Sequence, residues 1–371
     1  MTNELRVIIS GGGTGGHIFP AVSIANAIKV LRPEAKILFV GALGRMEMQR
    51  VPAAGYEIVG LPIRGFLRPL WKPGNVGVAV DYLRSKWKAK KLLRDFRPQV
   101  AVGVGGYASS AALGAANALG IPTLLQEQNS YAGLANKTLA RKAAKICVAY
   151  EGMERFFPAE KIMLTGNPVR QQLLETAVTR DDAVRSLGFD PLKKVVLLVG
   201  GSLGARTINE SVLQHLDLIK GSNVQFVWQT GKYYSAEIAE RMKGHDIPNL
   251  KVTDFITNMG AAYQAADLVV SRAGAGSISE FCLLGKPVIL VPSPNVAEDH
   301  QTKNALALVN KQAALYVKDV EAAKLLLPLA TDTVNDEAKL KQLSENILKM
   351  ALPDSAEIIA KEVIKLAENG N

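Results

Sequence analysis

The chain repeats one local pattern three times: an apolar, strand-like run leads into a glycine-rich turn and then into a helix-like segment. The three turns lie at 11–17, 200–206 and 272–280. Glycine allows a tight turn, and the main-chain N–H groups at the start of the next helix can bind a phosphate. In open parallel sheets, ligands bind beyond the carboxyl ends of the strands, where such turns lie. The pattern therefore predicts an α/β protein with a phosphate-containing ligand.

Strand-like and helix-like segments alternate along the whole chain, and the pattern restarts near 166–170. Strand-like runs lie at 5–10, 36–40, 100–104, 123–126 and 146–149, and again at 194–199, 224–229, 251–253, 268–271 and 288–291. This alternation is typical of doubly wound parallel sheets. We expect two Rossmann-like domains facing a cleft, at 1–166 and 167–348, with a helix starting at Asn167 and Pro168. The segment 349–371 should form a helix that packs back toward the first domain.

The first glycine turn also fits a different class of protein. Gly11, Gly13 and Gly16 satisfy G-x-G-x-x-G, the fingerprint of NAD-binding folds. That fold needs an acidic residue at the end of the second strand to hold the ribose, but the segment 39–43 contains no carboxylate. A P-loop is excluded because His17 stands where a lysine is required. A single turn of this kind can be a tight connection without a ligand, whereas three turns in two sheets favour a nucleotide site.

Glu280 has two interpretations. Ser277 and Glu280 have the spacing of a capping box, which would explain both residues as helix-start signals. A carboxylate one turn into a helix, beside a phosphate site, can instead accept hydrogen bonds from two ribose hydroxyls. The residue types alone leave both interpretations open.

The basic charge is concentrated in one segment. The net charge of the chain is +10, and 64–97 contains ten basic and two acidic residues. Apolar and aromatic residues lie between these cations, as on proteins bound to a membrane surface. We expect an anionic membrane to contact Leu67, Leu70, Trp71, Trp87 and Lys88. An ordinary solvated helix face is the alternative, and nucleic acid is not expected because no recognition motif accompanies the charge.

Other features of the sequence indicate the compartment. The segment 98–126 has no charged residue, but glycines and polar residues interrupt it, so we expect no membrane-spanning helix there. The two cysteines lie far apart in apolar runs, which fits a reducing compartment. The N-terminus has no signal-peptide pattern. We therefore expect a cytoplasmic protein.

Taken together, these motifs resemble the MurG family, the glycosyltransferases that add N-acetylglucosamine to lipid I in bacterial peptidoglycan synthesis. The resemblance covers nearly the whole chain, and the motifs are specific as a set. The matching segments are Gly11–His17 with Phe19 and Pro20, Arg45–Glu47, Gly105–Tyr107, Glu127–Asn129, Gly166–Arg170, Gly200–Arg206, Arg272–Glu280, Gln301 and Asn304.

The resemblance implies a GT-B fold whose second domain holds most of the donor, UDP-N-acetylglucosamine. Arg170 and Ser202 would contact the donor diphosphate, Ile256 the uracil and Glu280 the ribose. The full set of donor contacts that it implies is Thr14, Gly15, Gly16, Asn129, Arg170, Ser202, Ile256, Ala275, Gly276, Glu280 and Gln301. The family often has a second glutamine where this chain has His300, so the role of position 300 stays open.

The resemblance also implies the acceptor and the reaction. The 4-hydroxyl of an N-acetylmuramyl residue would attack C1 of the donor sugar, with inversion and release of UDP. Gly13, Tyr107 and Glu127 would contact this acceptor, an undecaprenyl-diphosphate-linked lipid. His17 is the candidate base; alternatively, it hydrogen-bonds the glycine loop or binds the acceptor's diphosphate. The chain would act peripherally at the cytoplasmic face of the inner membrane.

No D-x-D motif occurs in the chain, so we expect no carboxylate-held catalytic metal, and no cofactor is implied. Three alternatives to this function remain. A related GT-B enzyme could use another lipid acceptor, an NAD-dependent dehydrogenase could use the first glycine turn, and a non-catalytic scaffold could bind the nucleotide or a lipid surface without turnover.

Overall fold

The structure is a computed structural model that describes residues 4–13, 15–65, 74–169 and 178–369. The chain forms two compact units. The first unit comprises Met1–Val169 and Leu352–Asn371, and the second comprises Arg170–Ala351. The C-terminal segment therefore returns to the unit in which the chain begins.

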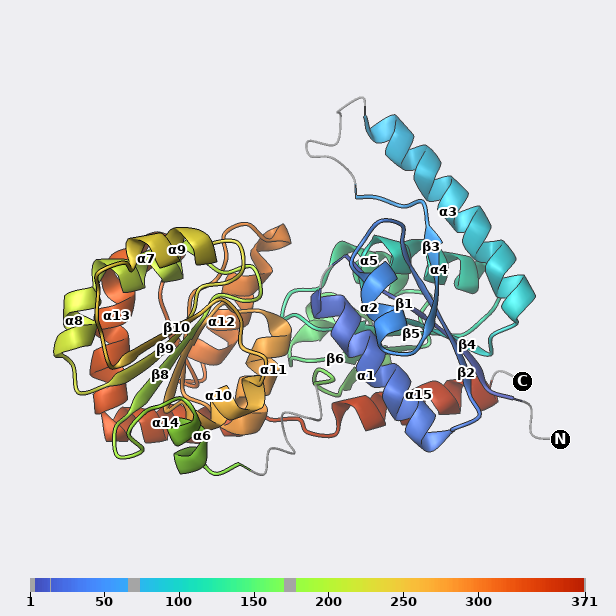
Figure 1. Cartoon of the computed structure of the whole chain (residues 1–371). Coiled ribbons are helices and arrows are strands. Elements are labelled where there is room, and N and C mark those ends of the chain that lie inside the picture. Colours follow the sequence, from blue (N-terminus) through green and yellow to red (C-terminus); the bar gives the residue numbers. More distant parts are fainter. Residues whose placement is uncertain (1–3, 14, 66–73, 170–177, 370–371) are drawn as a thin grey trace. The chain divides into compact units, whose positions relative to one another are not determined.

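A parallel sheet forms the centre of the first unit (Figure 1). In the described part of this unit the sheet has seven strands, in the order β3-β2-β1-β4-β5-β6-β7, and all neighbours are parallel. The order reverses between β1 and β4, and such a switch point is where open α/β sheets bind ligands. The strands are β1 (Arg6–Ser10), β2 (Lys36–Ala42), β3 (Glu57–Leu61), β4 (Val100–Gly103), β5 (Thr123–Glu127), β6 (Lys145–Val148) and β7 (Ile162–Leu164).

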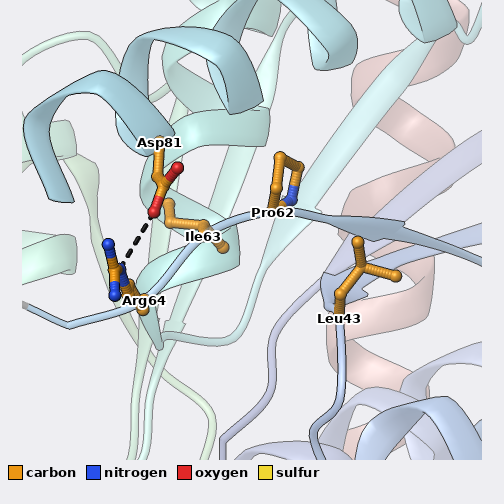
Figure 2. A pocket seen from close by; sticks show the side chains of 5 residues that line it. All are labelled: Leu43, Pro62, Ile63, Arg64 and Asp81. Carbon is orange, nitrogen blue, oxygen red and sulfur yellow. Dashed lines mark hydrogen bonds and ion pairs between the residues drawn. The ribbon is translucent and has the colours of Figure 1, made fainter. Parts of the chain in front are cut away.

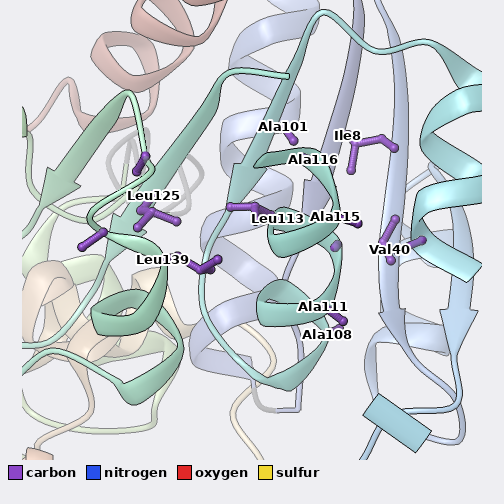
Figure 3. Packing of buried hydrophobic residues seen from close by; sticks show 14 of the residues in the cluster. Ile8, Val40, Ala101, Ala108, Ala111, Leu113, Ala115, Ala116, Leu125 and Leu139 are labelled. Carbon is purple, nitrogen blue, oxygen red and sulfur yellow. The ribbon is translucent and has the colours of Figure 1, made fainter. Parts of the chain in front are cut away.

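Helices bury both faces of this sheet, because successive side chains of a strand point to opposite faces. Ile8 of β1 belongs to a cluster with Leu113 of α4, shown in Figure 3. Its neighbours Val7 and Ile9 belong to a second cluster with Ile24 of α1. The helices of this part of the unit are α1 (Gly15–Leu31), α2 (Glu47–Ala53), α3 (Asn75–Phe96), α4 (Tyr107–Ala118) and α5 (Leu134–Leu139).

The last helix, α15 (Ser355–Asn369), completes the second of these clusters. Ile359 and Val363 are fully buried in it, beside residues of α1 and β1. An ion pair of 3.0 Å between Arg32 and Glu368 lies at the surface of the same contact. The helix is amphipathic, and its apolar side is buried in the core of the first unit.

The second unit has a similar parallel sheet. Within residues 178–351 it contains six strands, in the order β10-β9-β8-β11-β12-β13, with the switch point between β8 and β11. The strands are β8 (Val195–Val199), β9 (Gln225–Gln229), β10 (Leu250–Thr253), β11 (Leu268–Ser271), β12 (Val288–Leu290) and β13 (Leu315–Tyr316). The helices are α6 (Arg180–Ser186), α7 (Arg206–Gln214), α8 (Leu216–Gly221), α9 (Ser235–Arg241), α10 (Met259–Ala265), α11 (Ala275–Leu284), α12 (His300–Val309), α13 (Asp319–Asn335) and α14 (Glu337–Leu348).

The predicted α/β class with two Rossmann-like parallel sheets is confirmed. Every predicted strand is present, with ends that differ by two residues or fewer. The sequence pattern does not predict β3, β7 or β13. The prediction that a helix starts at Asn167 and Pro168 is wrong, since 165–169 is not helical. Asn167 accepts a hydrogen bond from Gln126 in β5 and donates one to the carbonyl of Gln128, directly after that strand.

Candidate functional site

The first glycine turn connects β1 to α1. Gly15, Gly16 and His17 are the first residues of α1, and Gly13 has a φ of 89°. The Nδ1 atom of His17 lies 2.9 Å from the carbonyl oxygen of Gly12. A carbonyl can only accept, so Nδ1 carries the hydrogen in this contact. In the neutral imidazole, Nε2 is then the nitrogen that takes up a proton.

Glu47 belongs to this site, and sequence reasoning gave it no role. Its carboxylate is fully buried, with Oε2 accepting a hydrogen bond from the N–H of Gly13 at 2.9 Å and Oε1 from the N–H of Ala42 at 3.0 Å. A Cβ on Gly12 would lie 2.1 Å from Oε1. The protein's own carboxylate therefore occupies the inside of the first turn. The signal in the sequence is the matching segment Arg45–Glu47, which carried no assignment.

The turn after β4 packs against the first turn. Gly106 has a φ of 85°, and a Cβ on it would lie 2.5 Å from the carbonyl oxygen of Gly12. Gly105 has a φ of 95°, and a Cβ there would lie 3.0 Å from Nε2 of His17. Only glycine adopts such angles without strain and leaves this space. The two turns at the switch point can therefore meet, with the His17 ring against Gly105.

Tyr107 begins α4 directly after these glycines, and its ring is exposed. A Cβ on Gly65 would lie 2.3 Å from Cζ of Tyr107, so the ring lies against the backbone of the segment that follows β3. This aromatic face beside the switch point can contact a substrate.

Glu127, an expected acceptor contact, is buried at the end of β5. One oxygen accepts hydrogen bonds from the main-chain and side-chain N–H groups of Asn129, at 3.1 and 3.3 Å. The other accepts from the N–H of Gly133 at 3.0 Å and from Nδ2 of Asn136 at 2.9 Å. These contacts fix the loop after β5, so the carboxylate positions Asn129, which was expected to contact the donor.

In the second unit, the glycine turn after β8 packs partly against the turn after β9. A Cβ on Gly204 would lie 2.2 Å from the carbonyl oxygen of Thr230, and one on Gly231 would lie 2.1 Å from the nitrogen of Gly204. The outer part of the turn is different. Gly201 has a φ of 84°, and no described atom lies within 4 Å of a Cβ placed on it. Ser202, beside it, is exposed, so this end of the turn is open.

The third turn leads from β11 into α11. The N-cap of α11 is Gly274, without a side-chain cap, so Ser277 lies inside the helix and the capping-box interpretation is wrong. Among the described residues, nothing lies within 4 Å of a Cβ on Gly274 or Gly276, and the first turn of α11 has no acidic residue. The positive end of the helix dipole and its N–H groups are therefore open to an anion. Ala275 and Gly276 form this helix start.

Glu280 lies on α11 with only 8% of its surface exposed. Its Oε2 accepts a hydrogen bond of 3.0 Å from the hydroxyl of Tyr263 on α10. Burial and this contact hold the carboxylate on the same helix whose start is open to a phosphate. That arrangement agrees with the ribose interpretation and gives Glu280 a structural partner as well.

The other expected donor contacts of the second unit lie in connecting segments or helix starts. Ile256 is half-buried between β10 and α10, and Gln301 lies in the first turn of α12. The Oε1 atom of Gln301 accepts a hydrogen bond from the N–H of Ser293 at 2.9 Å, which fixes the segment after β12. Arg272 pairs with Asp319 and donates to the carbonyl of Val291, which fixes the third turn against α13.

Residues 75–96 of the basic segment form α3, which packs on α4 and buries Val78, Ser85, Ala89 and Leu93. A second row of apolar side chains is exposed: Val76, Val80, Leu83 and Trp87. Spacings of three and four residues place this row along one side of the helix. Exposed cations flank the row on both sides: Arg84, Lys86, Lys91 and Arg94. Of this row, only Trp87 was among the residues expected to contact the membrane, and its side chain is 71% exposed.

Lys88 points elsewhere. Its Nζ donates a hydrogen bond of 2.8 Å to the carbonyl of Gly60 on β3, so the side chain ties α3 to the sheet. The expected membrane contacts Leu67, Leu70 and Trp71 and the expected donor contacts Thr14 and Arg170 lie outside the described residues. Within the described ranges, no helix has the length and apolar character needed to cross a bilayer.

A shallow hollow of about 430 Å³ lies beside the N-terminal half of α3 (Figure 2). Leu43, Pro62 and Ile63 give it an apolar lining, and the ion pair between Arg64 and Asp81, at 2.9 Å, forms its polar wall. The hollow therefore adjoins both the exposed helix α3 and the segment that follows β2.

In each unit, then, the predicted residues that the structure describes gather at the carboxyl edge of the sheet, apart from Trp87 and Lys88 on α3. The first unit contributes His17, the exposed Tyr107 and a glycine turn that is hydrogen-bonded to the buried carboxylate of Glu47. The second contributes two open glycine turns and a buried carboxylate. Such an edge binds phosphorylated ligands in α/β proteins.

Comparison with known proteins agrees with this arrangement. The Glycosyltransferase family 28 N-terminal domain matches residues 7–148, and the Glycosyltransferase family 28 C-terminal domain matches residues 195–359. A protein of Bacteroides fragilis is 68% identical over 369 residues, 99% of this chain and 97% of its own length. A protein of Bacteroides thetaiotaomicron is 67% identical over 374 residues and covers 100% of both chains.

Both relatives are named UDP-N-acetylglucosamine--N-acetylmuramyl-(pentapeptide) pyrophosphoryl-undecaprenol N-acetylglucosamine transferase. Among solved structures, MurG of Acinetobacter baumannii superposes with a TM-score of 0.76 at 26% identity, over 97% of this chain and 99% of that one. Two family domains in order and relatives at this identity over the full length leave one assignment. The chain belongs to glycosyltransferase family 28 and, within it, to the MurG family.

Proposed function

We propose that this chain transfers N-acetylglucosamine from UDP-N-acetylglucosamine to the 4-hydroxyl of the muramyl residue of an undecaprenyl-diphosphate-linked acceptor, with inversion and release of UDP. The observation that carries the proposal is 68% identity over 99% of the chain to a transferase named for this donor and acceptor. The product would be lipid II, the disaccharide-bearing precursor of peptidoglycan.

The second unit supplies the nucleotide site in this proposal. The described atoms leave open space beside the main-chain N–H groups of its two turns, at Gly201 and Gly276, and the first turn of α11 has no acidic side chain. The donor diphosphate would accept hydrogen bonds from these groups, which also stabilise the charge that develops on UDP as it leaves. Glu280, buried on the same helix, would hold the ribose hydroxyls.

His17 supplies the base. With Nδ1–H directed at the carbonyl of Gly12, Nε2 is the nitrogen that would take the proton from the acceptor hydroxyl. The alternative, in which His17 binds the acceptor's diphosphate, predicts a change in the KM for the acceptor rather than in kcat. The remaining proposed contacts are Thr14, Gly15, Gly16 and Asn129 with the donor and Gly13 and Tyr107 with the acceptor.

The exposed row on α3 supports binding to an anionic membrane at the cytoplasmic face. Trp87 with its apolar neighbours can enter the headgroup region while the flanking cations pair with lipid phosphates. Trp87→Ser should weaken binding to anionic vesicles roughly tenfold, because a large apolar side chain loses its buried area. The matched control is Leu192→Ser, which removes an isolated apolar side chain that is 94% exposed in the second unit. Equal loss in the two variants, or equal binding to neutral vesicles at high salt, would count against a membrane role for α3.

A substrate panel tests the proposed function. UDP-N-acetylglucosamine, UDP-N-acetylgalactosamine and UDP-glucose are each offered with a muramyl-pentapeptide undecaprenyl-diphosphate acceptor, in the presence of EDTA, and UDP release is followed. We expect turnover with UDP-N-acetylglucosamine alone and no loss in EDTA. Turnover only with a different lipid acceptor would favour the related GT-B enzyme, and UDP binding without turnover would favour a scaffold.

A further inference from the structure

The first glycine turn carries more than a histidine. Glu47, from α2, is fully buried beneath it and accepts a hydrogen bond from the N–H of Gly13 at 2.9 Å. On the opposite side of the turn, the carbonyl oxygen of Gly12 accepts a hydrogen bond from Nδ1 of His17, also at 2.9 Å. The carbonyl of residue 12 and the N–H of residue 13 belong to one peptide group. A single peptide therefore connects the carboxylate to the imidazole.

Hydrogen bonds at the two ends of one peptide polarise each other. The negative charge of Glu47 at the N–H end increases the electron density on the carbonyl oxygen, and that oxygen then binds the Nδ1–H of His17 more strongly. The contact strengthens further when the imidazole becomes positively charged, because a charged donor forms a stronger hydrogen bond than a neutral one. The chain thus has a path by which Glu47 stabilises protonated His17.

The surroundings fix both ends of this path. A Cβ on Gly12 would lie 2.1 Å from Oε1 of Glu47, and one on Gly41 would lie 2.6 Å from its Cγ, so two glycines make room for the carboxylate. The second oxygen of Glu47 is held by the N–H of Ala42 at 3.0 Å. At the other end, Gly105 leaves space for the edge of the imidazole that carries Nε2.

We propose that Glu47 is a positioning residue that acts on His17 through the Gly12–Gly13 peptide, holding Nδ1–H in place and stabilising the imidazolium. The inference rests on the proposed role of His17 as base. In the reaction, Nε2 takes the proton of the acceptor hydroxyl as the oxygen bonds to C1 of the sugar and the bond to UDP breaks. Glu47 stays ionised, and no proton passes through the peptide. The logic is that of the aspartate in a Ser-His-Asp triad, with one peptide inserted between carboxylate and histidine.

Other ionisable groups near His17 have different contacts. The first turn of α1, which carries His17, has no acidic residue. From the neighbouring turn, Tyr107 lies against Gly65, and the carboxylate of Glu127 at the end of β5 is held by its own loop. The hydrogen bonds of Glu47 and His17 meet at the two ends of the Gly12–Gly13 peptide.

The test is an NMR titration of the histidine rings in the unmodified protein and in Glu47→Gln. The chain has four histidines, so each ring signal can be assigned by substitution. Loss of the negative charge should let His17 lose its proton more easily, and its titration midpoint should fall by roughly half to one pH unit. The acid limb of the kcat/KM profile should move to lower pH by the same amount. An unmoved His17 midpoint in a folded Glu47→Gln protein would overturn the proposal.

Asp267→Asn is the matched control. The carboxylate of Asp267 also accepts a hydrogen bond from a main-chain N–H group, that of Val195, at 2.8 Å. Asp267 precedes β11 and therefore lies at the amino edge of the second sheet, away from the glycine turns at its carboxyl edge. This variant should lose stability without moving the His17 midpoint. An equal shift in both variants would show a general effect of destabilisation and overturn the specific role of Glu47.

A measurement on the unmodified protein covers the case in which Glu47→Gln does not fold. The nitrogen chemical shifts of His17 at high pH should show the Nδ1–H tautomer, and the opposite tautomer would overturn the proposal. Neither NMR readout depends on turnover. If the protein shows no transferase activity while the His17 midpoint still shifts in Glu47→Gln, the proposed function fails and the link between Glu47 and His17 stands.

Discussion

The two units build the same element, a strand followed by a glycine turn and a helix, but they fill it differently. In the first unit, the buried carboxylate of Glu47 lies inside the turn and binds the N–H of Gly13. In the second unit, the described atoms leave the space beside Gly201, Gly274 and Gly276 open. The glycine patterns of the two units look alike in the sequence, and the difference lies in what occupies the turn.

This difference separates two uses of one fold element. An open turn at a helix start can bind an external phosphate, whereas a turn already bound to a carboxylate repels one. The first turn is therefore poorly suited to the pyrophosphate of a dinucleotide, which is a further argument against the dehydrogenase alternative. In the proposed function, the first turn holds His17 and the turns of the second unit hold UDP.

The largest effect should come from His17→Ala. If the first turn serves catalysis and not nucleotide binding, kcat should fall about 10²- to 10⁴-fold, the usual contribution of a general base. The Kd for UDP, measured by calorimetry, should change less than twofold. The control is His215→Ala, because His215 also directs Nδ1 at a carbonyl, that of Ser211, but lies at the end of α7 in the second unit. A His17→Ala protein with more than a third of normal kcat would remove His17 from the chemistry.

A glycine-to-alanine substitution should destabilise the protein more in the first turn than in the turn before α11. Gly12→Ala places a Cβ against the carboxylate of Glu47 and should cost about 1–3 kcal/mol of unfolding free energy, as overpacking does. Gly274→Ala meets nothing among the described residues and has a φ of −70°, so its cost should stay within about 0.5 kcal/mol. Urea unfolding measures both. Equal costs would mean that the turns are packed alike and would break the comparison.

Glu280→Gln should have a smaller effect, which appears in the KM for the donor. Loss of the charged acceptor should raise the KM for UDP-N-acetylglucosamine about tenfold, the value of one charge-assisted hydrogen bond. Tyr263→Phe removes the hydroxyl that binds Glu280 while leaving the carboxylate, and its effect on KM should stay below about threefold. If the two variants raise KM equally, Glu280 serves Tyr263 and not the ribose.

The smallest effect concerns a property that the two units share. Burial raises the pKa of the Cys147 thiol in the first unit and that of the Cys282 thiol in the second to about 12. Since the thiolate is the reactive form, neither residue should react with a maleimide at neutral pH while the protein is folded, and activity should be unchanged. Mass spectrometry before and after unfolding measures this. Rapid labelling of Cys282 in the folded protein would show that α11 is less closely packed than the structure has it.

The periodic part of the fold could be predicted from the sequence. Runs such as Val195–Val199 are apolar throughout, which is the pattern of a strand buried on both faces. The pattern does not predict β7 or β13, because three and two residues are too few to show a period. The helix expected to start at Asn167 and Pro168 is absent from 165–169, where the side chain of Asn167 is hydrogen-bonded to Gln126 and to the carbonyl of Gln128.

Sequence reasoning located the glycine turns correctly between strands and helices, because a glycine cluster after an apolar run indicates such a turn. Glu47 was missed because a carboxylate was sought at the end of the second strand. It lies five residues beyond Ala42, and α2 returns it to the glycine turn. Lys88 was assigned to the membrane by composition, whereas its ammonium group binds the carbonyl of Gly60. Contacts between segments distant in the sequence decide such cases, and a local pattern does not contain them.

Hydrogen exchange with and without UDP tests the central difference between the two units most directly. Saturating UDP should slow exchange of the amides at 201–206 and 274–278 in the second unit. The amides at 12 and 13 in the first unit should be unchanged, because Glu47 already holds that turn. Protection at 12 and 13, with no change at 274–278, would mean that UDP binds the first turn and not the start of α11.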